Sequence, residues 1–564
     1  MVTLRVTLSQ LDPVLGDFKH NILKAKEAID AAEETQSDLV LFPELFLAGH
    51  PAQDLLLRKS FLNDCKQAID EIVQYTKNKK VVCVLGSPLH DGDTYNAAIV
   101  IRNGEILGAH RKTTLSEYFL EGRYFQTGHS ITILRLGSLK LGLTINEDLF
   151  RSDRTLTELL KNGVRVILNV RASPYVLGEW KEHEERILKM ASKHELGIAS
   201  CNMAGAQDEI VFAGASFACD ASGNLLARAR LFEEEIVTVD IDLKDDAFVS
   251  RNHTRRAQTI DCGETRDKEG KVRSSISPSY TQEQEMFVAL VTGLRAYVRK
   301  NGFKKVVLGL SGGIDSSLVA TIAVEALGAE NVKGVLMPSM YTSKESVEDA
   351  LQLAQNLGIE TLTIPITDVY EQYLKALATV FSNAARDATE ENIQARVRGN
   401  YLMALSNKFG WLVLTTGNKS EVATGYCTLY GDTAGGFAVI SDIYKTDVYR
   451  IARWYNSWKG KQIIPERVFT KPPTAELRPG QTDQEKLPPY EVLDGILKLY
   501  IEENLDARDI VERGYDSDTV IKVLHMIRAN EYKRRQLPIG IKISKRTLSK
   551  DWHMPVTNRF TEPA

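Results

Sequence analysis

The chain has few cysteines, and none of them is spaced to hold a metal or to build a disulfide framework. Six Cys are scattered singly through 564 residues, with no Cys-x-x-Cys pair, and the ten His form no metal-spaced cluster. This usage is typical of reduced thiols in the cytosol. The sequence therefore predicts a cytoplasmic protein.

The chain also lacks a charge bias and a long apolar run. Its 70 Lys and Arg nearly balance 74 Asp and Glu, for a net charge of −4. Such a balance predicts no broad attraction to nucleic acid or to a membrane surface. No apolar run approaches the ~18 residues of a membrane span, and the opening MVTLRVTLSQLDPVLGDF does not resemble a signal peptide. We expect neither nucleic acid nor membrane as a partner.

Short apolar runs alternate with amphipathic segments in two long stretches of the chain. Between them, residues 246–278 are rich in charge and glycine and show no apolar period. A chain of this length exceeds one ordinary core. The pattern predicts two α/β domains, at residues 1–245 and 279–564, joined by a linker or long exposed loop at 246–278.

A glycine- and serine-rich turn, SGGIDSS, follows the apolar run KVVLGL and precedes a helical segment. Adjacent glycines let backbone N–H groups approach a ligand closely, and a helix N-terminus adds positive potential. Asp315 would face the phosphates only with Mg²⁺ between the two negative charges. The motif lacks the Gly-Lys-Ser/Thr of a Walker loop. It resembles the PP-loop of ATP pyrophosphatases, which split ATP into AMP and pyrophosphate.

Five segments downstream of this loop narrow the resemblance. ENIQARVRGNYLMALSN, VLTTGNKSEVATGYCTLYGD, DIYKTDVYRIARW, KPPTAELRPGQTDQEKLPPYEVLD and NEYKRRQ occur in this order. Together with the PP-loop they resemble the NAD⁺ synthetase family over residues 280–550, which implies a doubly wound parallel sheet. The resemblance implies ATP contacts at Gly309, Leu310, Ser311, Gly312, Gly313, Ile314, Asp315, Ser316, Thr416 and Lys445. It implies Mg²⁺ at Asp315 and Glu421, and deamido-NAD⁺ at Asn392, Glu421 and Lys533.

The implied reaction joins ammonia to a carboxylate at the expense of ATP. The nicotinate carboxylate of deamido-NAD⁺ attacks the α-phosphate of ATP, and ammonia displaces AMP from the adenylate to leave NAD⁺. Positioning and electrostatic stabilisation carry such chemistry, so no covalent enzyme nucleophile is needed.

The first half of the chain resembles the nitrilase superfamily, whose amidase domains precede synthetase domains and hydrolyse glutamine. LVLFPELFLAGHP, HRKTTLSEYFLEGRYFQTG and GLTINEDLF carry this resemblance over residues 1 to about 245. It implies an αββα sandwich with Glu44 as general base and Lys112 as stabiliser of the tetrahedral intermediate. Asn146 stands where that family has its nucleophilic Cys. An amide is a very poor nucleophile, which predicts that glutamine hydrolysis is lost.

Other positions around the expected glutamine pocket are mixed. Tyr118 and Ser173 agree with the family's glutamine contacts, whereas Glu179 replaces a Lys and Ala213 replaces an Asp. Three departures, with Asn146, favour natural decay over a single engineered substitution, and both readings stay open. Cys201 is the alternative nucleophile in this domain, but its sequence context favours a buried small apolar residue.

Three hypotheses follow for the activity. The first is an ATP- and Mg²⁺-dependent NAD⁺ synthetase that uses free ammonia, with a glutaminase half that is inactive. The second is that glutamine is still used, through another nucleophile or a partner glutaminase. The third is a nucleotide-binding regulatory pseudoenzyme. The family resemblance also implies a homo-oligomer, a dimer through the synthetase domains.

Overall fold

The computed structural model describes residues 2–151, 153–243, 257–382 and 384–562. The chain forms two compact units, each of which is described by itself. The N-terminal unit comprises Met1–Gln207 and Val211–Ser279, and the C-terminal unit comprises Asp208–Ile210 and Tyr280–Ala564. Among the residues described, no helix is long and apolar enough to cross a membrane.

The N-terminal unit contains two large mixed sheets. The first has the strand order β14 (Glu235–Leu243), β1 (Val2–Gln10), β2 (Leu39–Leu41), β3 (Val82–Asp91), β4 (Asp93–Arg102), β5 (Glu105–Arg111). The second has the order β13 (Leu225–Arg228), β12 (Phe217–Cys219), β9 (Gly197–Asn202), β8 (Val166–Arg171), β7 (Leu139–Ile145), β6 (Ile131–Leu136), β15 (Ala257–Asp261). A separate ribbon pairs β10 (Ala204–Gln207) with β11 (Ile210–Ala213).

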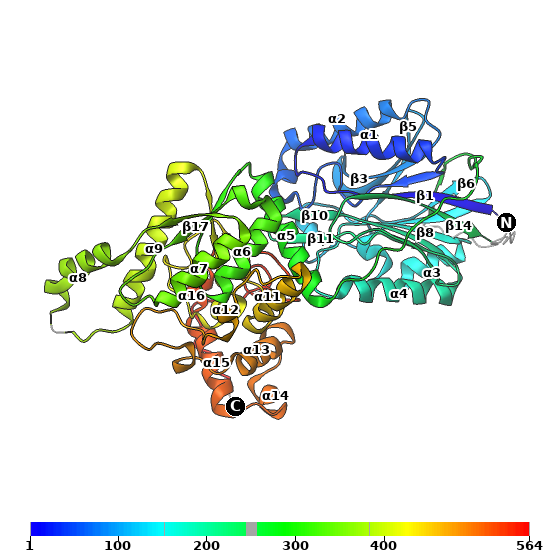
Figure 1. The fold of residues 1–564 in the computed structure, drawn as a ribbon. Helices are drawn as coiled ribbons and strands as arrows, with labels where there is room; N and C mark the ends of the chain where they lie inside the picture. Colours follow the sequence, from blue (N-terminus) through cyan, green and yellow to red (C-terminus); the bar gives the residue numbers. More distant parts are fainter. Residues whose placement is uncertain (1, 152, 244–256, 383, 563–564) are drawn as a thin grey trace. The chain divides into compact units, whose positions relative to one another are not determined.

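The two sheets enclose the main core of this unit, and helices cover their outer faces. Alternate residues of β1, among them Leu4 and Val6, pack against β7 and β8 of the other sheet, as a period of two predicts. Figure 1 shows α1 (Phe18–Glu34) and α2 (Lys59–Tyr75) on one side, and α3 (Asp153–Lys161) and α4 (Glu179–His194) on the other. The predicted αββα sandwich is confirmed.

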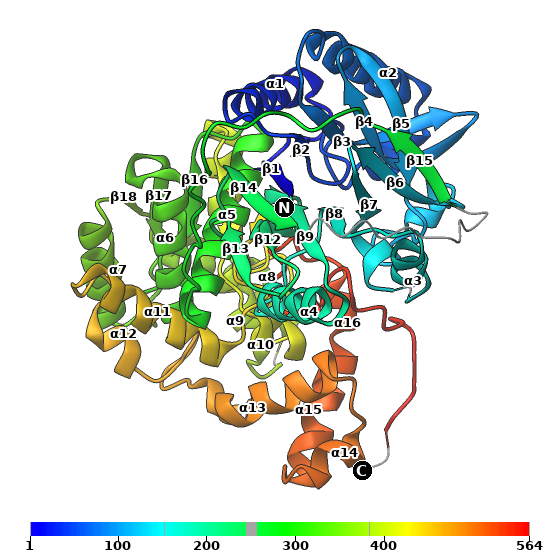
Figure 2. The ribbon, with the colours of Figure 1, turned by 90° about the vertical axis from the view of Figure 1, so that its right-hand side faces the viewer.

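The segment predicted as a linker or long exposed loop, 246–278, contains a strand in the part that the structure describes. Residues 246–256 of that prediction lie outside the described residues. Ala257–Asp261 forms β15, which pairs in parallel with β6 at the edge of the second sheet (Figure 2). Beyond it, the backbone N–H groups of Arg266 and Val272 donate to Asp38 and Asp240. Because these partners lie far away in the sequence, no local apolar period predicts that the segment packs on the N-terminal unit.

The C-terminal unit is built on a five-stranded parallel sheet. Its order is β18 (Glu360–Thr363), β17 (Val332–Leu336), β16 (Val306–Gly309), β19 (Leu412–Thr415), β20 (Phe437–Ala438). Here α8 (Thr367–Phe381) and α9 (Ala388–Phe409) pack against one face, and α6 (Ile314–Leu327) lies against the other with α5 (Gln282–Lys300) and α11 (Lys445–Lys459). The predicted doubly wound sheet is confirmed.

The remaining helices of this unit flank the sheet or form a second cluster. They are α7 (Lys344–Leu357), α10 (Lys419–Thr424), α12 (Glu466–Thr470), α13 (Tyr490–Leu497), α14 (Ala507–Glu512), α15 (Ser517–Ala529) and α16 (Glu531–Arg534). Leu493, Ile510 and Val523 of α13, α14 and α15 share one apolar core with Val422 of α10. That core fixes α10, which carries part of the site described next.

Candidate active sites

Asn146 lies at a sharp elbow directly after β7. It begins a single 3₁₀ turn, Asn146–Leu149, and its φ of +39° lies in the left-handed region that only a few residue types adopt readily. The buried carboxylate of Asp148 braces the turn, because it accepts the Ile145 N–H at 3.1 Å and pairs with His110 Nε2 at 2.8 Å. The elbow that the sequence predicted is therefore present.

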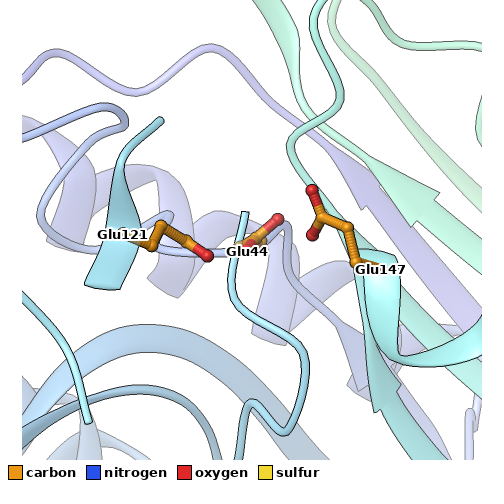
Figure 3. A group of neighbouring side chains, drawn as sticks. All are labelled: Glu44, Glu121 and Glu147. Atoms are coloured by element: carbon orange, nitrogen blue, oxygen red, sulfur yellow. The ribbon is translucent and has the colours of Figure 1, made fainter. Parts of the chain in front are cut away.

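A buried ammonium lies next to this elbow, among three carboxylates. Lys112 Nζ lies 2.7 Å from Glu44, 2.9 Å from Glu121 and 2.6 Å from Glu147. Figure 3 shows Glu121 and Glu147 on either side of Glu44. The Asn96 amide donates to both Glu44 and Glu121, at 2.8 Å each. The three carboxylates could together hold a cation, and the Lys112 ammonium already fills that role.

The charges in this cluster do not cancel, and the pKa values reflect this. Burial raises the pKa of the Glu44 carboxyl to about 7, Lys112 opposes the rise, and Glu121 and Glu147 add to it. Burial alone would lower the pKa of Lys112, but the three carboxylates outweigh it and raise it well above its ordinary value. Glu44 can thus take up a proton near neutral pH, as a general base must.

The side chain at the elbow is held by a short chain of hydrogen bonds. Ser173 Oγ donates to Asn146 Oδ1 at 2.8 Å, and Arg171 donates to Ser173 Oγ through Nε at 3.2 Å and Nη2 at 2.9 Å. Ser173, which the family resemblance gave as a glutamine contact, thus lies beside residue 146.

The other predicted residues of this half lie in varied surroundings. Tyr118 is half-buried against Phe119, whereas Glu179 is exposed in the first turn of α4. Ala213 is buried at the end of β11. Cys201 lies on β9 in the core between the sheets, where burial raises the pKa of its thiol to about 12. A thiol that stays protonated in an apolar core is not an activated nucleophile.

In the C-terminal unit the SGGIDSS segment forms a tight loop between β16 and α6. Gly312 has φ +77°, and a Cβ there would lie 2.2 Å from the backbone oxygen of Ser346. Only glycine fits this position. Ser316 and Ser317 donate to the Gly313 carbonyl at 3.1 and 2.7 Å. The loop is therefore shaped by its own hydrogen bonds before any ligand binds.

This loop borders a cavity of about 320 Å³. Eleven of the predicted residues line it: Gly309, Leu310, Ser311, Gly312, Gly313, Ile314, Asp315, Ser316, Thr416, Glu421 and Lys445. Leu336, Met337 and Leu402 give one wall an apolar surface. A cavity with an apolar wall and a glycine-rich loop at a helix N-terminus can hold a nucleotide base and its phosphates.

A second lysine–carboxylate cluster lies at this cavity. The Lys445 ammonium pairs with Asp315 and lies 3.5 Å from Glu421. Asn418 caps α10 and donates to Asp315 Oδ1 at 2.9 Å. Burial and the neighbouring Asp315 raise the pKa of Glu421 to about 8. One ammonium does not balance the negative charge of two carboxylates. Such a pair suits Mg²⁺, which typically binds one or two carboxylates plus phosphates.

The two remaining predicted residues meet at one segment. Lys533 Nζ donates to the carbonyl oxygens of Gly425 and Cys427 at 2.8 and 2.9 Å, and Asn392 Oδ1 accepts from Thr428 Oγ1 at 2.9 Å. Both side chains thus hold residues 425–428, which follow α10.

Sequence reasoning missed several members of both sites. Glu121, Glu147 and Arg171 were not named, because the contacts of Glu121 and Glu147 with Lys112 and of Arg171 with Ser173 appear only in the folded chain. Asn418 had a signal: NKSE has the N-cap and N3 residue types of a capping box, and the structure forms that box with Glu421. Arg398 and Lys471 also line the ATP-loop cavity and were not named.

Comparisons with known proteins agree with this geometry. Residues 5–248 match the carbon–nitrogen hydrolase family, and residues 286–537 match the NAD synthase family. An amidase-type elbow therefore precedes an ATP-dependent synthase unit, which defines a carbon–nitrogen ligase of the NAD⁺ synthetase class.

Similarity extends over the whole chain. It is 58% identical to the glutamine-dependent NAD(+) synthetase of Thermotoga maritima over 100% of both chains. It is 47% identical to that of Aquifex aeolicus over 99% of this chain and 100% of the relative. A solved glutamine-dependent NAD⁺ synthetase from Acinetobacter baumannii, in complex with ADP, shares 37% identity over 100% of both chains, with a TM-score of 0.76. The chain belongs to the glutamine-dependent NAD(+) synthetase family.

Proposed function

We propose that this chain is an NAD⁺ synthetase that uses free ammonia and that its amidase half is inactive. The observation that carries the proposal is Asn146 at the elbow beside Glu44 and Lys112. The relatives are named glutamine-dependent, so this proposal sets the chain apart within its family.

The C-terminal cavity supports the synthetase half of the proposal. ATP would lie with its phosphates along Gly309–Ser316 and its base toward Thr416 and the apolar wall. The nicotinate carboxylate of deamido-NAD⁺, held near Asn392, Glu421 and Lys533, attacks the α-phosphate and pyrophosphate departs. Lys445 reduces the repulsion between these anions. Ammonia then adds to the adenylated carbonyl, and AMP leaves.

Asp315 and Glu421 are the residues that would hold Mg²⁺ in this cavity. The ion, when bound, would neutralise charge on the phosphates. Its binding would favour the ionised form of Glu421, whose pKa is raised to about 8 in its absence by burial and by Asp315.

The amidase half supports loss of glutamine hydrolysis because it lacks a nucleophile at residue 146. Glu44 is ready to accept a proton and Lys112 is in place. The lone pair of the Asn146 amide is delocalised, so it cannot form the thioester-like intermediate that the reaction needs. Cys201 is buried in the core between the sheets, which argues against it as a replacement.

The nitrogen source tests the proposal directly. The purified chain is given ATP, deamido-NAD⁺, Mg²⁺ and either ammonium or glutamine as the only nitrogen source. We expect NAD⁺ with ammonium and none above background with glutamine. NAD⁺ from neither source would favour the regulatory pseudoenzyme.

A Glu44→Gln variant provides the control for contamination. Glutamine use that persists in this variant comes from a separate glutaminase. Glutamine use by the unmodified chain that disappears with Glu44→Gln would overturn the proposed loss of hydrolysis.

A further inference from the structure

Arg171, at the end of β8, has an unusual environment for a guanidinium. Its side chain is only 7% exposed, and burial lowers its pKa to about 10. Its hydrogen bonds go to the hydroxyl of Ser173. Within the described residues it forms no ion pair. A buried cation without a directly paired carboxylate costs free energy, so its position beside the elbow needs a physical reason.

The hydroxyl of Ser173 has no hydrogen-bonding capacity left. A serine hydroxyl offers one donor and two acceptor sites. Its donor goes to Asn146 Oδ1, and its oxygen accepts two N–H groups from Arg171. A glutamine entering beside residue 146 would have to break this arrangement before Ser173 could bind it.

The charge of Arg171 is compensated at longer range. Glu147 and Glu44 both stabilise its charged form electrostatically. These are two of the three carboxylates that surround the single Lys112 ammonium. A second cation next to this cluster offsets negative charge that Lys112 leaves unbalanced. The guanidinium is therefore stabilised beside the elbow without direct pairing.

We propose that Arg171 closes the approach to residue 146 by holding Ser173 and occupying space that a glutamine side chain would need there. This inference rests on the proposed loss of glutaminase activity and deepens it. It adds a second barrier that is independent of the missing thiol. Restoring the nucleophile alone would leave the approach to residue 146 closed.

Three variants test the role of Arg171. They are Asn146→Cys, Asn146→Cys with Arg171→Ser, and Asn146→Cys with Arg186→Ser as the matched control. Arg186 is an exposed arginine on α4 that lies 4.8 Å from the Phe150 ring centroid and close enough to Arg171 to lower its pKa. Its removal therefore makes the same charge change near the elbow but keeps the two hydrogen bonds from Arg171 to Ser173. Glutamate release from glutamine is measured for each. We expect at least a tenfold gain from Arg171→Ser and no gain from Arg186→Ser.

Alkylation by iodoacetamide gives a second readout, independent of hydrolysis. A neighbouring guanidinium stabilises a thiolate and lowers the pKa of its thiol. The pH profile of alkylation should therefore give a lower thiol pKa in Asn146→Cys than in the variant that also carries Arg171→Ser. Melting temperatures check that each variant folds, and Arg171→Ala replaces Arg171→Ser if the latter does not.

The possible failures can be told apart. Equal hydrolysis by Asn146→Cys with and without Arg171→Ser would overturn the closure role and leave the proposed function intact. No hydrolysis by either, with identical alkylation profiles, would also overturn it. Glu44-dependent hydrolysis by the unmodified chain would instead overturn the proposed function itself.

Discussion

Each unit of the molecule contains a buried lysine among carboxylates, and the two clusters differ in what lies beside them. Lys112 is surrounded by Glu44, Glu121 and Glu147 next to an elbow whose side chain, Asn146, is an amide and a very poor nucleophile. Lys445 pairs with Asp315 beside a glycine-rich loop and an open cavity. The comparison teaches that a charge cluster by itself does not define an active site. The neighbouring atoms decide whether a reactant can reach it.

The largest expected effect tests the open cluster. Asp315→Ala should lower NAD⁺ synthesis with ammonium by about 10³-fold, an electrostatic loss of about 4 kcal/mol in the transition state. Asp368→Ala is the matched control, since it removes an exposed first-turn carboxylate from α8. Turnover at saturating Mg²⁺ is the measurement. Near-normal turnover would remove Asp315 from the site.

The next effect tests the loop beside that cluster. Gly312→Ala should raise the KM for ATP at least tenfold, because the new Cβ would collide with the Ser346 carbonyl and distort the loop. Gly302→Ala carries a similar backbone cost, about 1–2 kcal/mol, at φ +78° with open space around it. It should lower stability and leave the KM for ATP unchanged. Equal KM values would show that loop shape does not govern ATP binding.

A smaller effect concerns the dinucleotide. Lys533→Ala releases two carbonyl groups of residues 425–427 and removes a cation. We expect the KM for deamido-NAD⁺ to rise about tenfold, a loss of about 1.4 kcal/mol, with a smaller change for ATP. Lys522→Ala, an exposed lysine on α15, is the control. A selective effect on ATP would contradict this assignment.

The last effect concerns the pH dependence of stability and is the smallest on turnover. In the folded chain the pKa of Glu421 is raised to about 8, from its ordinary value of 4.5. As the pH rises, Glu421 loses its proton in the unfolded chain before it does so in the folded chain. The free energy of unfolding therefore falls progressively between about pH 4.5 and 8. Glu421→Gln should remove this fall, whereas Glu491→Gln, an exposed carboxyl on α13, should not.

Calorimetry without ligands measures this difference. A change of about 1 kcal/mol moves the melting temperature of a unit of this size by roughly 2–4 °C. If the melting temperature depends on pH in the same way for the unmodified chain and for Glu421→Gln, burial does not raise the pKa of Glu421.

The sequence predicted those features that depend on local pattern. Gly312, Asp315 and the elbow at Asn146 lie in short motifs, and the structure gives them the predicted local form. It could not predict Arg171 or Glu121, because their importance arises only when β8 and the loop after β5 meet the elbow. The exposure of Glu179 was also hidden, since its first-turn position on α4 does not reveal which way it faces.

The strand β15 has a consequence for the solubility of the N-terminal unit. It covers the outer edge of β6 with a parallel partner, and an uncovered edge strand is a template for pairing with another chain. A fragment cut at residue 245, where the sequence pattern ends the first domain, would leave that edge bare and would aggregate. A fragment that continues to Ser279 would keep β6 paired behind the short, polar edge strand β15 and stay dispersed.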